Sequence, residues 1–298
     1  MARLAQTAGL TDVQTEILSA VKTFVDKEIL PYANDLEHKD EFPEAIVEGM
    51  KEMGLFGLMI SEEYGGLGES LTTYALVVEQ IARGWMSVSG VINTHFIVAY
   101  MINQHGTQEQ KDYYLPRMAT GEIRGAFSMS EPECGSDVSA IKSRATKDGE
   151  FYVLNGQKMW LTNGGRSGVV ATLVKDDTGG DSVYKNMSVF LVDKEPGFGE
   201  TAPGVTIPGK IDKMGYKGVE TTEMILDGAR LGADKAKPPH AAINAPNDGK
   251  SVQRQRAAVH VRKAAPVWLD VAKHGKRRAQ KRRLADQRLI KAVANPAP

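Results

Sequence analysis

The sequence predicts an α+β protein in which a helical segment is followed by a β-rich segment. Over residues 1–122, apolar side chains recur with the period of an amphipathic helix, and over residues 123–231 the period shortens to the alternation of half-buried strands. Short strands separated by Gly, Asp and Asn turns are typical of a sandwich or a barrel. Residues 232–298 follow neither pattern, so we expect a third segment of different character there.

The helical segment is predicted to contain five helices. Thr11 and Gln14 have the spacing of a capping box, so the first helix begins there, and Pro31 is expected to end it. A second capping box, Thr107 with Gln110, opens the last helix. The three helices between them are expected over residues 43–54, 71–82 and 86–104.

The β-rich segment is predicted to contain short strands joined by tight turns. The dipeptides Asp148-Gly149 and Asn155-Gly156 favour the turns of β-hairpins, because these residues adopt left-handed backbone conformations readily. Strands are expected over residues 124–129, 139–147, 151–154, 158–162, 169–175, 188–192, 205–207 and 222–226.

The overall composition excludes several classes of protein. Of the 298 residues, 42% are hydrophobic and 25% are charged, which is ordinary for a globular chain. The single cysteine excludes an intramolecular disulfide framework, and the six histidines lack metal-ligand spacing, so no metal site is expected. No run of about 18 apolar residues occurs, so no membrane span is expected. The first residues lack the pattern of a secretory signal, so we expect a cytoplasmic protein.

The formal net charge is zero, but the two signs are segregated along the chain. Residues 232–298 contain 16 Lys and Arg against 4 Asp and Glu, a net charge of +12, so residues 1–231 carry a net charge of −12. Six of the eight residues in 276–283 are basic. Two unlike compositions therefore meet near residue 231.

Two stretches have compositions that suit a cofactor site. Residues 127–137 end a predicted strand and turn twice, and Gly135 with Ser136 would let the backbone and a hydroxyl approach a phosphate; a plain hairpin turn remains the alternative. Alternation over residues 158–162 places Lys158, Trp160 and Thr162 on one strand face. A broad aromatic ring beside a hydroxyl suits a flat heteroaromatic cofactor, whereas a core Trp with an edge Thr is the alternative.

These stretches and three others together resemble the acyl-CoA dehydrogenase family. The resemblance covers about residues 10–231, and its motifs occur in the family's order. They are Glu-Glu-Tyr-Gly-Gly-Leu-Gly at 62–68, His-Gly-Thr-Gln-Glu-Gln-Lys at 105–111, Ser-Glu-Pro-Glu-Cys-Gly-Ser-Asp at 130–137, Asn-Gly-Gln-Lys-Met-Trp-Leu-Thr-Asn-Gly at 155–164 and Lys-Met-Gly-Tyr-Lys-Gly at 213–218. Ser128 and Cys134 depart from the small residues that the family usually has at these positions.

The resemblance implies a fold, a cofactor and a reaction. It implies a helical N-terminal domain over residues 1–122, an antiparallel β-barrel middle domain with FAD-contacting loops over residues 123–231, and a C-terminal helical bundle after it. The implied reaction is α,β-desaturation of an acyl-CoA thioester, in which a glutamate removes the α-proton and FAD accepts the β-hydrogen as hydride. The implied partners are the acyl-CoA substrate and an electron-transfer flavoprotein, and family members are usually homo-oligomers.

The resemblance also assigns individual residues to the site. Ser136 matches a position that touches the CoA ligand as well as the cofactor, Trp160 would lie beside the flavin ring, and the Thr162 hydroxyl would bond near flavin N5. The positions that match the family's FAD contacts are Phe127, Met129, Ser130, Gly135, Ser136, Trp160, Leu161 and Thr162.

Residues 232–298 do not resemble the family's third domain. The family's catalytic glutamate lies in that domain, and residues 232–298 contain no Glu, so no catalytic residue is named and we expect the bundle to be missing and the activity impaired. The alternative function is a non-catalytic truncated or frameshifted remnant, or a flavin- or acyl-CoA-binding module with a basic tail.

The sequence leaves the structure of this tail open, and three interpretations of it remain. The first is a shifted reading frame, and the second is a divergent helical segment. The third is a genuine basic appendage that binds an acidic partner or nucleic acid through residues 276–283. Nucleic acid is not among the partners that we expect.

Overall fold

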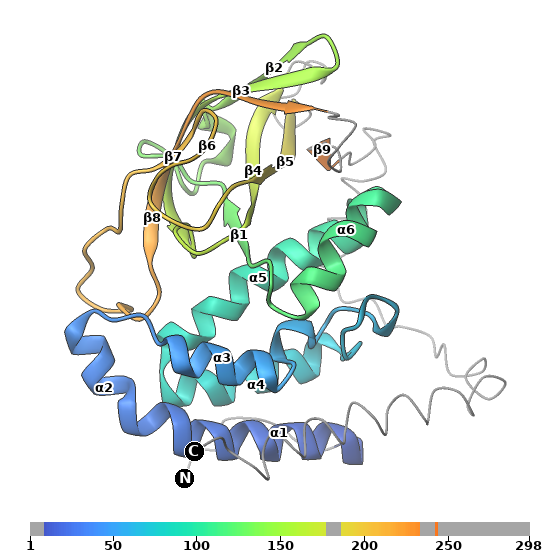
Figure 1. Cartoon of the computed structure of the whole chain (residues 1–298), viewed down its shortest axis with the longest axis vertical. Helices are drawn as coiled ribbons and strands as arrows, with labels where there is room; N and C mark the ends of the chain where they lie inside the picture. Colours follow the sequence, from blue (N-terminus) through green and yellow to red (C-terminus); the bar gives the residue numbers. More distant parts are fainter. Residues whose placement is uncertain (1–8, 177–185, 233–241, 244–298) are drawn as a thin grey trace, which may run out of the picture. The chain divides into compact units, whose positions relative to one another are not determined.

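The computed structural model describes residues 9–176, 186–232 and 242–243, which fall within one structural unit, Met1–Asn244. Helices come first along the chain and strands follow, as the change of hydrophobic period predicts (Figure 1). The predictions made for residues 233–298, including the missing bundle and the basic contact surface, lie outside the described residues apart from the short strand at 242–243.

The helical segment contains six α-helices and short turns of other helix types within the described residues. The α-helices are α1 (Asp12–Phe24), α2 (Leu30–Lys39), α3 (Glu44–Glu52), α4 (Leu71–Gly84), α5 (Met86–His105) and α6 (Gln108–Ala119). Both predicted capping boxes are present, Thr11 with Gln14 at α1 and Thr107 with Gln110 at α6. In the described part of the chain, no helix is both long and apolar enough to span a bilayer.

The prediction that Pro31 ends the first helix is wrong. A π-helical turn, Val25–Ile29, follows α1. Pro31 lies in the first turn of α2, where N–H groups have no partner within the helix, so the N–H that proline lacks costs no helical hydrogen bond. The helical path therefore continues to Asp40, whose backbone is left-handed, with φ of 59°. The buried face also continues, because Val25 and Ile29 are fully inaccessible to solvent.

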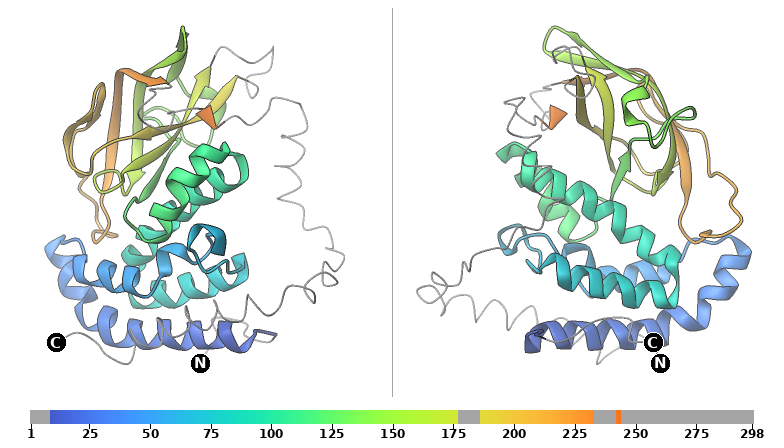
Figure 2. Two further views of the ribbon diagram at one scale, coloured as in Figure 1. Left: turned by 45° about the vertical axis from the view of Figure 1, so that its right-hand side comes forward. Right: turned by 180° about the vertical axis from the view of Figure 1, so that it is seen from behind.

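The described strands form one sheet in the order β6-β7-β8-β3-β2-β4-β5-β9, and β1 pairs with β4. Their bounds are β1 (Gly125–Ser128), β2 (Arg144–Asp148), β3 (Phe151–Thr162), β4 (Val169–Asp176), β5 (Met187–Asp193), β6 (Gly199–Ala202), β7 (Val205–Ile207), β8 (Thr221–Gly232) and β9 (Ala242–Ile243). The predicted antiparallel pairing holds for six of the ladders, whereas β1–β4 and β2–β4 are parallel. Figure 2 shows the curl of this sheet from two sides.

The strands differ from the prediction in several places. Residues 151–154 and 158–162 belong to one long strand, β3, because the chain passes Asn155-Gly156 with a shift of register and without a turn. Only the second half of the segment predicted over residues 139–147 is a strand, since Val138–Ala140 is a 3₁₀ turn. Strand β6 was not predicted, because its residues, Gly-Glu-Thr-Ala, show no apolar alternation.

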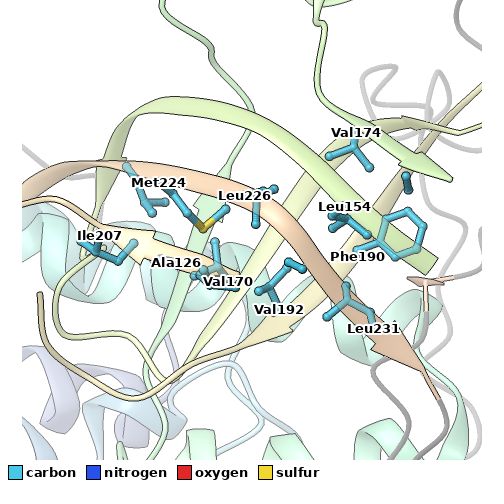
Figure 3. Packing of buried hydrophobic residues seen from close by; sticks show 14 residues of the cluster. Ala126, Leu154, Val170, Val174, Phe190, Val192, Ile207, Met224, Leu226 and Leu231 are labelled. Carbon is cyan, nitrogen blue, oxygen red and sulfur yellow. The ribbon is translucent and has the colours of Figure 1, made fainter. Parts of the chain in front are cut away.

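The core of the sheet lies inside its curl. Met224 and Leu226 of β8, Leu154 of β3, and Phe190 and Val192 of β5 point toward one another and are each at most 3% exposed (Figure 3). Burying such side chains contributes about 1.5–3 kcal/mol each. This core holds β3 in place, and β3 carries the second predicted cofactor segment.

Helix α5 joins the helices to the sheet. It contacts α4, α6, β1 and β3, and many of its side chains are buried, among them Val88, Val91 and Ile92. A second connection is the carboxylate of Glu37 on α2, which accepts hydrogen bonds from the backbone of Lys217 and Gly218 and from the Trp85 indole. The predicted cofactor segments therefore lie on a sheet that is fixed against the helices.

Candidate functional site

The first predicted cofactor segment leaves the end of β1 and folds back on itself at once. Glu131 and Cys134 exchange two backbone hydrogen bonds, Glu131 N–H to Cys134 O at 2.8 Å and Cys134 N–H to Glu131 O at 3.2 Å. This tight turn leaves Gly135 and Ser136 exposed. The space around Gly135 is open, because a Cβ atom there would meet nothing nearer than Ser130 Oγ, at 3.9 Å. The predicted turn is therefore present and its backbone is accessible.

The second predicted segment lies directly beside the first. Met159 N–H donates to Ser130 O at 2.9 Å, and the Lys158 ammonium donates to Met129 O at 3.1 Å. The same ammonium donates to Glu131 Oε1 at 2.9 Å. Residues about 30 positions apart in the sequence are thus adjacent in the structure.

The Lys158–Glu131 ion pair is buried, with side-chain exposures of 0% and 6%. Glu131 also accepts hydrogen bonds from the backbone N–H groups of Lys142, at 2.6 Å, and Ser143, at 3.0 Å. Burial alone would raise the pKa of Glu131, but the hydrogen bonds from Ser143, Lys142 and Lys158 outweigh it and lower this pKa. Burial lowers the pKa of Lys158, and Glu131 opposes that effect.

The predicted alternation over residues 158–162 is wrong, because β3 contains a bulge there. The pairing with β8 changes register between Lys158 and Leu161, and Trp160 has a left-handed backbone, with φ of 63°. Lys158 and Leu161 are consequently buried, whereas Trp160 is 57% exposed. Trp160 is therefore not a core residue, and it does not share a strand face with Lys158. Its indole is open to solvent.

The segment ends at Asn163, which ties it to helix α5. The Asn163 side chain is buried and donates to Val91 O at 2.9 Å and to Thr94 Oγ1 at 2.6 Å. Its backbone is left-handed, with φ of 64°, a conformation that asparagine adopts more readily than most residues. Lys158, just before the bulge, and Asn163, at the end of the segment, are therefore both anchored by buried hydrogen bonds.

The remaining predicted residues differ in what they offer to a ligand. Phe127 is half-buried on β1, and Thr162 is half-buried at the end of β3, opposite Thr221 of β8. The side chain of Leu161 is only 1% exposed and belongs to the core of the sheet, so only its backbone remains for a ligand. Met129, Ser130, Gly135 and the start of the second segment are brought together by the contacts described above.

Sequence reasoning missed three residues that hold the site together, Lys158, Glu131 and Asn163. Glu131 and Lys158 lie within the two candidate stretches and Asn163 directly follows the second, but charged and amide side chains in exposed-looking segments carry no signal of burial. Lys158 becomes informative only once the bulge is known, because a lysine that is directed inward needs a carboxylate partner.

A separate hollow of about 420 Å³ lies away from these residues. Its lining includes Phe42, Arg166, Phe198 and Glu220, and none of the predicted site residues. Arg166 lies over the Phe42 ring, 3.8 Å from its centre, and 4.0 Å from the Glu220 carboxylate. Over the ranges that the structure describes, no three His, Cys, Asp or Glu side chains are grouped so that they could hold a metal ion.

Comparison with known proteins agrees with the two-part organisation of the chain. Residues 11–122 match the model of the acyl-CoA dehydrogenase N-terminal domain, and residues 126–229 match that of the acyl-CoA dehydrogenase middle domain. The chain is 36% identical over 231 residues to (2S)-methylsuccinyl-CoA dehydrogenase of Cereibacter sphaeroides, which covers 76% of this chain and 42% of that protein. The chain spans about half the length of the curated relatives that it matches.

Solved structures show the same architecture. The acyl-CoA dehydrogenase of Bacillus anthracis complexed with FAD is similar with a TM-score of 0.68 and 30% identity, covering 80% of this chain and 40% of that one. A chain from the structure of the electron-transferring flavoprotein of Acidaminococcus fermentans is similar with a TM-score of 0.68 and 28% identity, covering 76% of this chain and 58% of that one. From its two domain matches and these relatives, the chain belongs to the acyl-CoA dehydrogenase family, of which it carries the N-terminal and middle domains.

Proposed function

We propose that the surface formed by residues 129–136 and 158–162 binds FAD in an acyl-CoA dehydrogenase. The observation that carries this proposal is the exposed indole of Trp160, whose neighbour Met159 is hydrogen-bonded to Ser130 in the segment that contains the open turn at Gly135. An exposed indole offers a broad aromatic face on which a flat heteroaromatic ring can stack. The FAD named for the similar Bacillus anthracis structure supports the choice of cofactor.

The residues of this surface fit a dinucleotide whose ends differ in character. The Trp160 indole would cover one face of the flavin ring, and the Thr162 hydroxyl would hydrogen-bond to its edge. Backbone N–H groups at Gly135 and Ser136 and the Ser130 hydroxyl would bind phosphate oxygens, which do not need a lysine when several donors converge. Phe127, Met129 and the backbone of Leu161 would complete the apolar contact. FAD would supply the hydride acceptor that no side chain provides.

The reaction proposed for the whole enzyme is α,β-desaturation of an acyl-CoA thioester, with Ser136 also contacting the CoA. The described residues would bind and orient the cofactor, and they would exclude water from one face of the flavin. The proton-abstracting glutamate belongs to the family's third domain, and residues 232–298 contain no Glu, so we propose that desaturation by this chain is impaired. An electron-transfer flavoprotein as partner and a cytoplasmic location complete the proposal.

A second candidate function is a flavin-binding module that catalyses nothing. The absence of Glu from residues 232–298 favours it, because the family's base would then have no counterpart. Both functions require the same flavin surface, so they differ only in what a bound acyl-CoA does to the flavin.

The proposal is tested by titrating the purified full chain with FAD under anaerobic conditions and then adding acyl-CoA thioesters of several chain lengths. We expect saturable quenching of flavin fluorescence, at micromolar or weaker affinity if the third domain contributes half of the cofactor contacts. Loss of the flavin absorbance band on adding acyl-CoA supports the enzyme, and binding without bleaching supports the module. A chain that leaves FAD fluorescence unchanged at all concentrations contradicts both.

A further inference from the structure

The Lys158–Glu131 ion pair is the most deeply buried charge pair among the described residues, and its two members come from different segments of the candidate site. Lys158 lies on β3 immediately before the bulge, and Glu131 lies in the turn after β1. Their charged atoms are 2.9 Å apart, at side-chain exposures of 0% and 6%. The other described ion pairs each include at least one more accessible partner, so this pair is exceptional within the described fold.

Stability alone is a weak reason for such a pair. Removing two charges from water carries a large desolvation penalty, and well-packed apolar side chains of similar volume often stabilise a fold equally well or better. What an apolar pair cannot reproduce is the direction of the bonds. The Lys158 ammonium donates to both Met129 O and Glu131 Oε1, and Glu131 accepts two further backbone N–H groups, from Lys142 and Ser143.

These bonds fix the first segment against the second in one register. Met129 and Glu131 flank Ser130, whose carbonyl accepts the Met159 N–H. Three successive residues of the first segment are therefore bonded to two successive residues of the second. A slip of one residue would leave a buried charge unpaired, which is strongly destabilising.

The pair also stands next to a strained position. Trp160 has φ of 63°, a conformation in which bulky residues are rare and which persists only where the surroundings impose it. On one side the chain is held by buried Lys158, and on the other by buried Leu161 and Asn163. Release of Lys158 would let this stretch of β3 relax toward the regular alternation that its sequence favours, in which the indole changes its face.

We propose that Lys158 and Glu131 are positioning residues that hold Trp160 outward and fix it relative to the turn of residues 130–136. The inference rests on the proposed function only in assigning flavin as the ligand of this surface. The positioning itself is a property of the protein without ligand, so it is measurable separately.

The test uses the full chain with the double substitution Lys158→Met and Glu131→Gln, which removes both charges and nearly preserves volume. The matched control is Arg230→Met with Asp148→Asn, which removes an ion pair on the same sheet whose members are more than half exposed. A second control, Leu154→Ala, truncates the core at the other end of β3 and reproduces a loss of stability without touching the pair. If the double variant does not fold, Glu131→Gln alone replaces it.

The first measurement is acrylamide quenching of Trp160 in the ligand-free protein, obtained as the difference between each protein and its Trp160→Phe counterpart. We expect the quenching constant of Trp160 to change by at least about twofold in the double variant, since exposure of the indole depends on the bulge. Both controls should keep the wild-type value. An unchanged constant in a folded charge-free variant overturns the inference.

The second measurement is the dissociation constant for FAD. We expect at least about a tenfold increase for the double variant and no change for the controls, because the Trp160 indole and the backbone donors of the turn would no longer be held in one arrangement, and hydrogen bonds weaken steeply as their geometry worsens. If the wild-type chain binds FAD and the double variant binds it equally well, the inference fails. If the wild-type chain binds no FAD, the proposed function fails, and the quenching constant alone decides whether the pair positions Trp160.

Discussion

At the scale of single residues, the candidate site depends on side chains whose burial contradicts their usual preferences. Lys158 is charged and fully buried, whereas Trp160 is largely apolar and more than half exposed. The bulge in β3 produces both reversals at once, because it shifts the alternation by one residue between them. The proposed ligand-binding surface and its buried support therefore share the same local irregularity.

The Thr162 hydroxyl is predicted to contribute to flavin affinity. Thr162→Val preserves shape and removes one hydrogen-bond donor, so we expect the dissociation constant for FAD to rise about tenfold, the equivalent of one hydrogen bond of about 1.4 kcal/mol. Thr206→Val, at another half-buried threonine, on β7, is the control and should leave it unchanged. Equal dissociation constants for FAD in fluorescence titrations of the two variants would show that Thr162 does not contribute to the site.

His95 is predicted to make stability depend on pH. Burial lowers the pKa of His95 to about 4, from an ordinary value of 6.5, and its ring bonds to Phe56 O at 3.1 Å. Between these pH values the unfolded chain binds a proton here that the folded chain does not, so the free energy of unfolding should fall by about 2 kcal/mol from pH 7 to pH 5. We expect His95→Gln to reduce this slope in urea denaturation.

The exposed histidine His38 provides the control for that measurement. His38→Gln should retain the wild-type dependence of unfolding free energy on pH. Parallel curves for wild type and His95→Gln would show that the buried imidazole does not cause the slope.

At the scale of elements, the end of β3 is fastened to helix α5 by one side chain. Asn163 donates to Val91 O and Thr94 Oγ1 while its backbone occupies the left-handed region. This contact gives a reason for polar Thr94 within the largely apolar α5, because the Thr94 hydroxyl accepts a hydrogen bond from the Asn163 amide.

Replacing Asn163 should therefore loosen the junction of helix and strand. Asn163→Gly keeps the left-handed backbone accessible and removes the bonds, so we expect a loss of about 2 kcal/mol of unfolding free energy. Asn163→Ala should lose about 1 kcal/mol more, because it adds left-handed strain. Urea denaturation measures both, and equal stability of the Gly variant and wild type would contradict a structural role for the amide.

Most elements follow from local sequence, and the exceptions have two different physical causes. The capping boxes at Thr11 and Thr107 are contacts within one turn, so the sequence alone predicts them. The continuation of the helix past Pro31 depends on a π-turn, and the inward direction of Lys158 depends on Glu131, 27 residues earlier. A local irregularity of the helix changes the pattern at Pro31, whereas contact between distant segments overrides it at Lys158, within the proposed flavin surface.

At the scale of the described unit, a single carboxylate ties helices α2 and α5 to the loop before β8. Glu37 accepts the N–H groups of Lys217 and Gly218, the Trp85 indole N–H at 2.8 Å and the Ser87 hydroxyl at 3.1 Å. Gly218 has no room for a side chain, because a Cβ atom would lie 2.2 Å from the Trp85 ring. The sheet that carries the candidate site is held against the helices at this point.

Glu37 is predicted to contribute to acid unfolding. Burial favours a higher pKa for Glu37, but the hydrogen bonds from Lys217, Trp85, Ser87 and Gly218 outweigh it, so its pKa is lower than the ordinary 4.5. The stabilisation is therefore present above pH 4.5 and is lost as the pH falls through the lower folded-state value. Glu37→Gln should be less stable at pH 7 and should lose less stability below pH 4.5. We expect the acid unfolding curves of wild type and Glu37→Gln, followed by circular dichroism, to differ. Curves that superimpose after normalisation would contradict a contribution of Glu37 to acid unfolding.

Amide hydrogen exchange of the full chain, with and without saturating FAD, tests most directly whether residues 129–136 and 158–162 form one flavin-binding surface. FAD should slow exchange in both segments together, most at Gly135, Ser136 and Thr162, and should leave the core strand β5 unchanged. Protection confined to other residues, such as the lining of the hollow near Phe42 and Arg166, or no protection at saturating FAD, would contradict the account.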